Sequence, residues 1–305
     1  MNANDIRTTI TNTIIESLEA GNGKLPPWRK PWAADPNGLG LATSLSTGKP
    51  YNGINQLLLQ VLAMKRGYQS RWFGTFQQIK AASASVRRGE KAVQVVLFRP
   101  VSRERTNEMG EQVEDKFLVM RTFSVFNVEQ TTGLDQFRIG FAQPSETIFE
   151  RFEAMDRLVA AVGIDLRHGG NKAFYSPGGD YIQMPHRHQF ESSETYYQTL
   201  AHEMTHWSEK RIGFDRVKEE NSYALGELVA ELAASFLLAE LGLPASENID
   251  NCTRYLDHWL KAMRGDTRFI FKAAATASKA VDFLLSHVRQ PEEQPVPAET
   301  EVGTC

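Results

Sequence analysis

The segment SSETYYQTLAHEMTHWSEKRIG, residues 192–213, decides how the C-terminal half of this chain folds. Its apolar residues recur at helical rather than strand spacing. Ser192 or Ser193 stands where a helix N-cap is expected, and Gly213 follows as a stop signal. The segment therefore predicts one amphipathic helix that ends near Gly213.

Three residues of this helix carry a definite chemistry. His202 and His206 are four positions apart, so on a helix both imidazoles project from one face and can share one cation. Glu203 lies beside them, where its carboxylate can take a proton from a water activated by the metal. The pattern predicts a metal site with two histidine ligands and Glu203 as the general base.

A second apolar helix, GELVAELAASFLLAELGLP at 226–244, is interrupted by two acids. Charged groups on a buried helix need a partner, and a metal with its ligands supplies one. We assign Glu227 as the third ligand and Glu231, one turn later, as acceptor of a hydrogen bond from a ligating histidine. The reverse order is an alternative. So is a structural role in which both acids are solvated or pair with nearby arginines.

Composition places the chain among ordinary globular proteins. It has 305 residues, of which 41% are hydrophobic and 23% charged, a length that suggests two domains. Its only cysteines are Cys252 and Cys305, which excludes a disulfide framework. No basic stretch followed by an apolar core opens the sequence, and no apolar run approaches 18 residues. We expect a cytoplasmic protein that makes no contact with a membrane.

The charge is unevenly distributed along the chain. Residues 1–130 hold 17 Lys and Arg against 11 Asp and Glu, whereas residues 131–305 hold 17 against 26. A basic half joined to an acidic half suggests that the first half meets a polyanion and that the second does something else.

The pattern predicts an α+β protein of two domains. A basic mixed α/β domain occupies 1–130, a linker 131–146, and a helix-rich domain 147–289, and a Pro- and Glu-rich disordered tail fills 290–305. Further elements are expected within them: helices at 4–20, 53–66 and 147–163, a turn and short helix around 70–82, a hairpin of 92–101 with 116–128 joined by a polar stretch, and two short strands around a Gly-Gly turn in 172–185.

Aromatic and basic residues alternate in the first domain. The loop PPWRKPW puts Trp28 and Trp32 around Arg29 and Lys30, a mixture that suits stacking on unpaired bases while cations meet phosphates. The alternative is that the tryptophans fill the core. No helix-turn-helix or zinc-finger spacing favours reading of duplex DNA. The same mixture continues in Arg66, Arg71, Trp72, Lys80, Arg87, Arg88 and Lys91.

Several longer segments resemble a known family. In the first half these are PYNGINQLLL (50–59), RWFGTFQQIK (71–80), VRRGEKAVQVVLF (86–98) and FSVFNVEQTTGL (123–134), which are similar to the N-terminal domain of the ArdC antirestriction proteins. The second half resembles the zincin-type metallopeptidase domain that follows it in that family, in KAFYSPGGDYIQMP (172–185), TLAHEMTHW (199–207) and ELVAELAASFL (227–237).

The resemblance implies a plasmid-borne protein that binds single-stranded DNA and protects incoming DNA from host restriction during conjugation. His202, Glu203 and His206 take the metallopeptidase roles of ligand, base and ligand, but the match does not choose between Glu227 and Glu231. Zinc is the expected metal, with manganese open because two histidines and a carboxylate do not select zinc uniquely. The target of proteolysis would be a host restriction enzyme or another protein.

Two other functions stay open from the sequence. In one, the protein acts by binding alone, and the metal only stabilises the fold. In the other it is a nuclease, which the absence of an Asp-rich cluster disfavours. If the chain is a peptidase, DYIQMP at 180–185 is the expected edge strand for an extended substrate, and Tyr223 is a candidate for oxyanion stabilisation against the alternative of ordinary packing.

Overall fold

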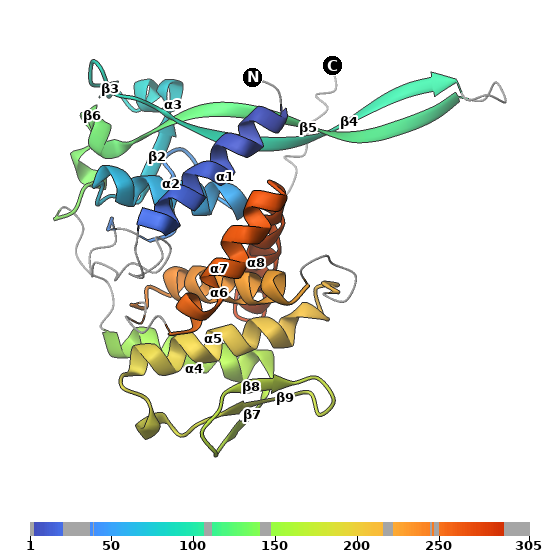
Figure 1. The fold of residues 1–305 in the computed structure, drawn as a ribbon. Helices are drawn as coiled ribbons and strands as arrows, with labels where there is room; N and C mark the ends of the chain where they lie inside the picture. Colours follow the sequence, from blue (N-terminus) through green and yellow to red (C-terminus); the bar gives the residue numbers. More distant parts are fainter. Residues whose placement is uncertain are drawn as a thin grey trace, which may run out of the picture.

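A computed structural model describes residues 3–20, 37–38, 40–106, 112–140, 148–215, 222–244, 246 and 250–289. Within these ranges the chain has an α+β fold in which a mixed N-terminal half lies above a helix-rich C-terminal half (Figure 1). The predicted tail at 290–305 and the Trp28–Trp32 loop fall outside the described residues.

The N-terminal half is built on a four-stranded sheet in the order β1-β2-β5-β4. Its strands are β1 Thr43–Ser44, β2 Trp72–Thr75, β4 Val93–Thr106 and β5 Gln112–Asn127, and its helices are α1 Ala3–Ala20, α2 Gly53–Arg66 and α3 Phe76–Ala81. The predicted bounds of α2 are confirmed. Its apolar run LLLQVLA is buried, and Gly67 ends it in the left-handed conformation that a helix C-terminus favours.

Strands β4 and β5 form a long antiparallel ribbon that projects from the body of the molecule (Figure 1). The sequence predicted this hairpin, but it placed the polar residues 102–115 in the connection. That prediction was wrong for most of the segment, because β4 continues to Thr106 and β5 begins at Gln112.

The start of the predicted linker 131–146 belongs to the N-terminal half. Strand β6, Thr131–Thr132, pairs with β3, Ser85–Val86, and Leu134 is fully buried. The short helices η1 Val128–Gln130 and η2 Asp135–Phe137 flank this strand. Asn37 donates hydrogen bonds from Nδ2 to the carbonyls of Gln136 and Arg138. Residues 141–147 lie outside the described residues.

The C-terminal half combines five helices with a small sheet in the described ranges. The helices are α4 Ile148–Val162, α5 Ser193–Glu209, α6 Ser222–Glu240, α7 Asp250–Gly265 and α8 Phe269–Leu285, with the short η3 at Arg187–Gln189. The sheet has the order β7-β9-β8, with β7 Asp165–His168, β8 Phe174–Ser176 and β9 Tyr181–Met184. Strands β8 and β9 confirm the two strands predicted around the Gly-Gly turn.

Strand β9 is the central strand of this sheet, so the expectation that 180–185 forms a substrate-binding edge was wrong. It pairs in parallel with β7 on one side and antiparallel with β8 on the other, so both of its main-chain edges are occupied. The strands with a free edge among the described residues are β7 and β8. Both contact α5, the helix that carries the histidines: β8 does so at Glu203, and β7 through His168 and Tyr196.

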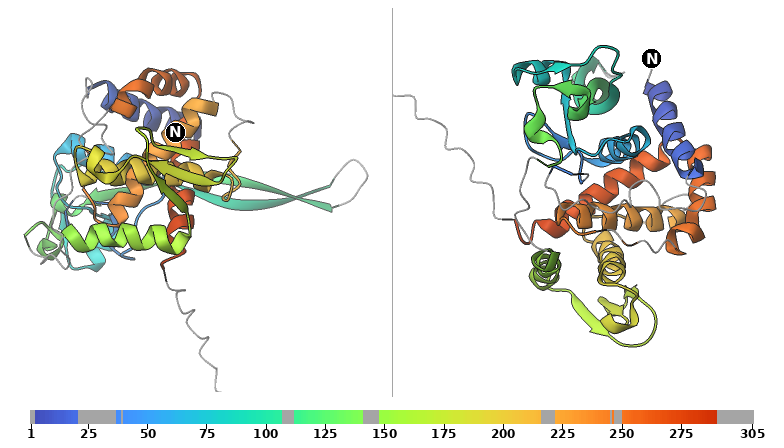
Figure 2. Two further views of the ribbon diagram at one scale, coloured as in Figure 1. Left: turned by 90° about the horizontal axis from the view of Figure 1, so that it is seen from below. Right: turned by 90° about the vertical axis from the view of Figure 1, so that its left-hand side faces the viewer.

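One hydrophobic core runs through both halves, from Ile10 in α1 to Leu285 in α8. Helix α8 packs on α2 and on α6, and the views in Figures 1 and 2 show it between the two halves. Small residues on α8 allow this close approach, and Gly53 lies where an added Cβ would be 3.6 Å from the Cα of Ala275. Helix α6 is long and apolar enough to cross a membrane, but 89% of it is buried inside the molecule, as a core helix is.

Candidate metal centre

Helices α5 and α6 bring three potential ligand side chains together. The Nε2 atoms of His202 and His206 are 3.1 Å apart, and the Glu227 carboxylate oxygens lie 3.5 Å from the first and 3.6 Å from the second. Ligand atoms about 2.0–2.1 Å from a tetrahedral ion are roughly 3.3 Å from one another. The separations of the three groups are therefore close to those of ligands around one small divalent ion.

Burial supports the same conclusion. His202, His206 and Glu227 are each less than 10% exposed, and they are the group of described residues whose ligand atoms converge in this way. Three such polar groups are expensive to bury unless they are paired or hold a metal. Helical spacing explains the arrangement, since i and i+4 residues of α5 share the face that meets α6.

The charges around His202 act on its protonation. Burial by itself lowers the pKa of this imidazole, but a hydrogen bond that it donates to Glu227 and the negative charges of Glu203, Glu227 and Glu231 together raise the pKa above its ordinary value. An excess of carboxylates over cations in a buried site is the electrostatic condition that favours binding of a cation.

Glu203 is held beside strand β8. Its Oε2 accepts a hydrogen bond from the backbone N–H of Tyr175 at 2.9 Å. Because this N–H bonds to Glu203 and not to Ile182, it points away from β9, toward the edge of β8 that no described strand covers. The carboxylate therefore lies between the histidine helix and the edge at which an extended chain could align.

One histidine ring has a carboxylate partner on its own helix. His206 donates from Nδ1 to Oε1 of Glu209 at 2.8 Å, so Glu209 does for one ligand what we expected of Glu231. The Nδ1 atom of His202 has no hydrogen-bond partner in the described part of the chain. Glu231 is almost fully buried on α6, and its negative charge raises the pKa of His202.

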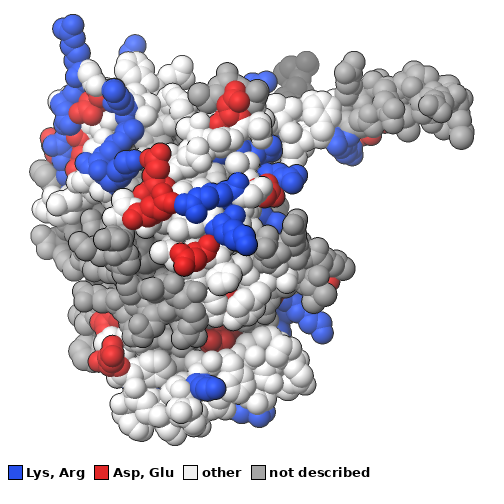
Figure 3. Space-filling view, in the orientation of Figure 1, with Lys and Arg blue, Asp and Glu red and all other residues white. Residues whose placement is uncertain are grey.

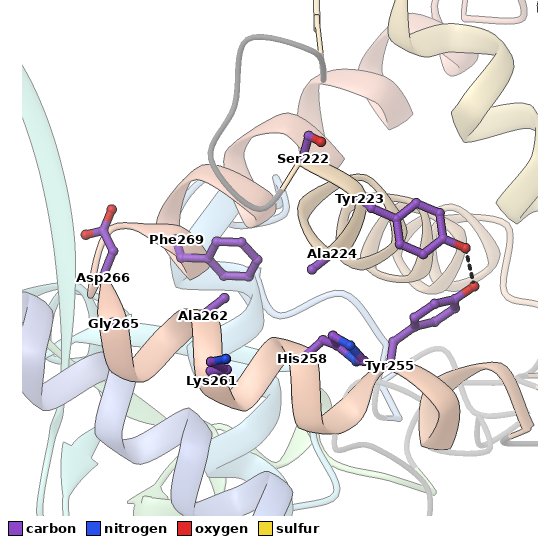
Figure 4. Close-up of a pocket in the computed structure, with 10 residues that line it drawn as sticks. All are labelled: Ser222, Tyr223, Ala224, Tyr255, His258, Lys261, Ala262, Gly265, Asp266 and Phe269. Carbon is purple, nitrogen blue, oxygen red and sulfur yellow. Dashed lines mark hydrogen bonds between the residues drawn. The ribbon is translucent and has the colours of Figure 1, made fainter.

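A cavity of about 740 Å³ lies next to this region, between the start of α6, α7 and the start of α8 (Figure 4). Tyr223 lines it and is 62% exposed, and its hydroxyl is 2.7 Å from that of Tyr255. In Figure 4 the two rings lie at one end of the cavity and Phe269 toward the other. Tyr223 thus makes a contact with α7, and its proposed oxyanion role stays a prediction.

Two of the predicted DNA-binding residues have internal partners. The Arg71 Nε donates to Leu41 O and to Thr43 Oγ1 at 3.1 and 3.0 Å, and burial lowers the pKa of its guanidinium. Trp72 donates from Nε1 to Asn37 Oδ1 and packs edge-on against Phe137. These contacts stabilise the N-terminal half, and a contact of Arg71 or Trp72 with DNA stays a prediction.

Five other predicted basic residues lie on the surface: Arg66, Lys80, Arg87, Arg88 and Lys91. Arg87 pairs with Glu90, and Arg66 donates to the Lys91 carbonyl. Figure 3 shows Lys and Arg side chains gathered over the corner that β3 and α3 form. An aromatic residue that the sequence analysis missed, Phe76, is 57% exposed there, one helical turn before Lys80. Trp28, Arg29, Lys30 and Trp32 lie outside the described residues.

Comparison with known proteins defines the class to which this fold and site belong. Residues 153–276 match the zincin-like metallopeptidases, and residues 4–126 match the N-terminal domain of anti-restriction factor ArdC. The uncharacterized protein y4eC of Sinorhizobium fredii (strain NBRC 101917 / NGR234) is 32% identical over 95% of this chain and 94% of its own length. The chain belongs to the ArdC antirestriction family, which confirms the resemblance seen in the sequence.

Solved structures agree with this assignment. The metal-free crystal structure of the antirestriction ArdC protein from plasmid R388 is 37% identical, with a TM-score of 0.75 over 93% of this chain and 97% of that one. Its Mn(II)-bound structure is 36% identical, with a TM-score of 0.72 over 92% and 97%. The two-domain fold and a divalent metal ion as cofactor are thereby supported.

A longer relative contains a similar region. The DNA primase TraC of Escherichia coli is 34% identical over 93% of this chain, but that match spans only 27% of TraC. The chain therefore corresponds to about a quarter of that relative's length.

Proposed function

We propose that this protein protects incoming plasmid DNA from host restriction during conjugation, acting in the recipient cytoplasm. Its N-terminal half would bind single-stranded DNA, and its C-terminal half would be a metal-dependent peptidase that acts on a host restriction enzyme or another protein. The observation that carries the catalytic part is the convergence of His202, His206 and Glu227 next to Glu203 and a free strand edge.

The residues divide the chemistry as follows. His202, His206 and Glu227 would hold the ion, which when bound polarises a carbonyl oxygen and a water molecule. Glu203 accepts the proton of the attacking water and later returns it to the leaving amine. The hydrogen bond from the Tyr175 N–H fixes the orientation of this carboxylate. Strand β8 would align an extended peptide by strand addition.

We propose zinc as the ion, in line with the zincin-like ligand set, with manganese as the alternative that the Mn(II)-bound relative suggests. Metal analysis of protein purified without added metal distinguishes the two. A preparation that carries neither ion, and takes up neither when each is supplied, would remove the basis of the catalytic proposal.

The catalytic part is tested by Glu203→Gln in a conjugation assay. A plasmid that carries the wild-type or the Glu203→Gln gene is transferred into recipients with and without a restriction system. Because the amide cannot take a proton, the variant should lose most of the protection in the restricting recipient and transfer normally into the other. If the Glu203→Gln protein still binds the metal and protects as well as wild type does, the proposal that protection requires proteolysis is wrong.

That outcome would favour a second function, in which the metal is structural and the protein acts by binding DNA or a restriction enzyme. The enclosure of the three ligand groups supports this alternative, since structural sites are closed. Glu227→Gln distinguishes a structural from a catalytic metal. Loss of a structural metal lowers the melting temperature and the protection together, whereas loss of a catalytic metal lowers the protection without a matching change in melting temperature.

The DNA-binding part rests on the exposed Phe76, Lys80 and Arg88 and on the Trp28–Trp32 loop. An aromatic side chain beside cations fits unpaired bases and phosphates. A fluorescence titration compares oligo(dT) with a duplex of equal length at two salt concentrations. We expect a preference for the single strand that weakens in Lys80→Glu/Arg88→Glu and in Trp28→Ala/Trp32→Ala, but not in Glu203→Gln. Equal or negligible binding to both forms would contradict this.

A further inference from the structure

The inner half of the β4–β5 ribbon exposes an unusual amount of apolar surface. Among the described residues, six of the eleven exposed large hydrophobic side chains lie on it, and Leu118 is the most exposed at 68%. Contiguous exposed apolar patches on soluble proteins mark interaction sites. The six are Leu97, Phe98, Val101, Phe117, Leu118 and Phe123.

The strand register distributes these side chains over both faces of the ribbon. Residues paired across the strands share a face, and successive residues alternate. One face therefore carries Leu97, Phe117 and Phe123 together with Arg99 and Arg121. The arm projects from the body, as Figure 1 shows, so the molecule itself does not cover both faces.

The opposite face has an apolar middle, bounded outward by Lys116, which pairs with Ser102. It carries the pairs Phe98 with Met120 and Pro100 with Leu118. A two-stranded ribbon with apolar side chains on both faces and no third strand is marginally stable in water. A partner that covers it would remove this apolar area from solvent.

The outer edge of β5 is free to accept another strand. The side chain of Asn55 bonds to both the N–H and the carbonyl of Val96. The main-chain polar groups of Val96 therefore point away from β5. Its partner Thr122 therefore also points outward, and by alternation so do Met120 and Leu118. Strand β2 covers β5 only from Val125 onward, and no described residue pairs with the edge before it.

The edge of β4 is less suited to pairing. Asn55 already occupies it at Val96, and Pro100 has no N–H to donate. An added strand is therefore expected along β5, next to the most exposed apolar residue, Leu118.

The charges of the ribbon indicate what such a strand carries. Between 93–102 and 117–125 there is no Asp, Glu or Lys, and Arg99 and Arg121 are the only charged residues. Neither arginine forms an ion pair with a described residue, and both are exposed. Aromatic residues, Met and Arg in the absence of Lys, Asp and Glu are the composition of protein–protein interface centres.

We propose that the inner β4–β5 ribbon is a docking arm for an extended segment of a partner protein that adds to β5. The segment has acidic side chains on the face of Arg99 and Arg121 and apolar ones on the face of Leu118 and Met120. Two cations on an arm roughly 30 Å long are too few to neutralise a nucleic-acid strand of that length. A second copy of the chain is disfavoured as the partner, because pairing of two such arms would bring arginines of like charge together.

The test measures binding of a fluorescein-labelled peptide, in which Asp alternates with Leu and Phe, to the full chain. The control is the same peptide with Lys in place of each Asp. Wild type should bind the acidic peptide, and binding should weaken about tenfold or more in Arg99→Glu/Arg121→Glu and in Leu118→Ser. Lys80→Glu/Arg88→Glu is the matched charge control and should bind as wild type does. Hydrogen exchange at Leu118 and Met120 should slow in the complex.

Four outcomes would overturn the proposal. In the first, the wild type does not prefer the acidic peptide; in the second, the Arg99→Glu/Arg121→Glu protein binds that peptide as tightly as the wild type. In the third, the Arg99→Glu/Arg121→Glu protein loses oligo(dT) binding while the Lys80→Glu/Arg88→Glu protein retains it. In the fourth, the wild type sediments as a dimer that Leu118→Ser dissociates. None depends on the metal centre, since metal binding by Leu118→Ser is measured alongside and should be unchanged.

Discussion

Glu209 accepts the Nδ1–H of His206 from one helical turn beyond it, and it was the residue missed in the sequence. The signal was available, because residues three apart on a helix are neighbours. Glu227 lies 3.5 and 3.6 Å from the two histidine nitrogens, and these distances support the proposal of Glu227 rather than Glu231 as third ligand.

We predict that Glu209→Gln weakens divalent metal binding by about 10- to 100-fold, because the amide no longer holds His206 with a charge-assisted bond. Calorimetric titration of Mn²⁺ and Zn²⁺ measures this. Glu194→Gln, on the first turn of the same helix, is the matched control and should bind as wild type does. Unaltered affinity in Glu209→Gln would show that the ring orientation is fixed by other contacts.

At the scale of elements, prediction succeeded where the determinants are local. The apolar run and Gly67 define α2, and the strands of the Gly-Gly turn follow from alternation around it. The order β7-β9-β8 could not be predicted, because β7 comes from a separate segment and its pairing depends on tertiary packing. The ribbon's length was missed because its outer residues are polar on both faces and give no alternating pattern.

Helix α5 is capped by Ser192, whose Oγ accepts the Thr195 N–H at 3.2 Å. We predict that Ser192→Ala lowers the free energy of unfolding by about 1 kcal/mol, whereas Ser193→Ala has a smaller effect. Denaturant unfolding monitored by circular dichroism measures both. Because the histidines lie farther along the helix, metal affinity should be unchanged. Equal destabilisation by the two variants would contradict the assignment of the cap.

Asp180 stabilises the turn between β8 and β9 in a pH-dependent way. Its hydrogen bond with Arg211 is the main reason that its pKa lies below 3.8, and Tyr175 adds a second bond. A carboxyl with a depressed folded-state pKa stabilises above its unfolded pKa, and this contribution is lost as the pH falls through the folded value. Asp180 has a positive φ that Asn also tolerates.

Asp180→Asn should therefore lower the melting temperature at pH 6, and the difference from wild type should disappear well below pH 3.8. Thermal scans of both proteins across this range test it. A difference that persists undiminished in acid would mean that the substitution acts through the backbone or the Tyr175 bond rather than through the charge.

For the whole molecule, the placement of α8 joins the two halves. Its alanines contact α2 on one side and α6 on the other, within a single core. The division into a basic and an acidic half was visible in the composition. This joint packing was not, since a helical pattern does not say which surfaces its faces will meet.

We predict one cooperative thermal transition for the full chain, with both halves unfolding together. Ala274→Leu, at a fully buried position on α8, should lower the stability of the whole by about 1–3 kcal/mol through overpacking. Differential scanning calorimetry with hydrogen exchange in each half measures this. Two resolved transitions, with only the C-terminal one shifted, would show that the halves fold independently.

The metal centre is the feature on which the proposed chemistry of this protein depends most. Its direct test is a titration of metal-stripped full-length protein with Mn²⁺ and Zn²⁺, for wild type, Glu203→Gln, Glu227→Gln and Glu231→Gln. We predict one ion per chain for wild type and for Glu203→Gln, a weakened site in Glu231→Gln, and the largest loss in Glu227→Gln. No stoichiometric binding by wild type, or undiminished binding by Glu227→Gln, would contradict the assignment of this site.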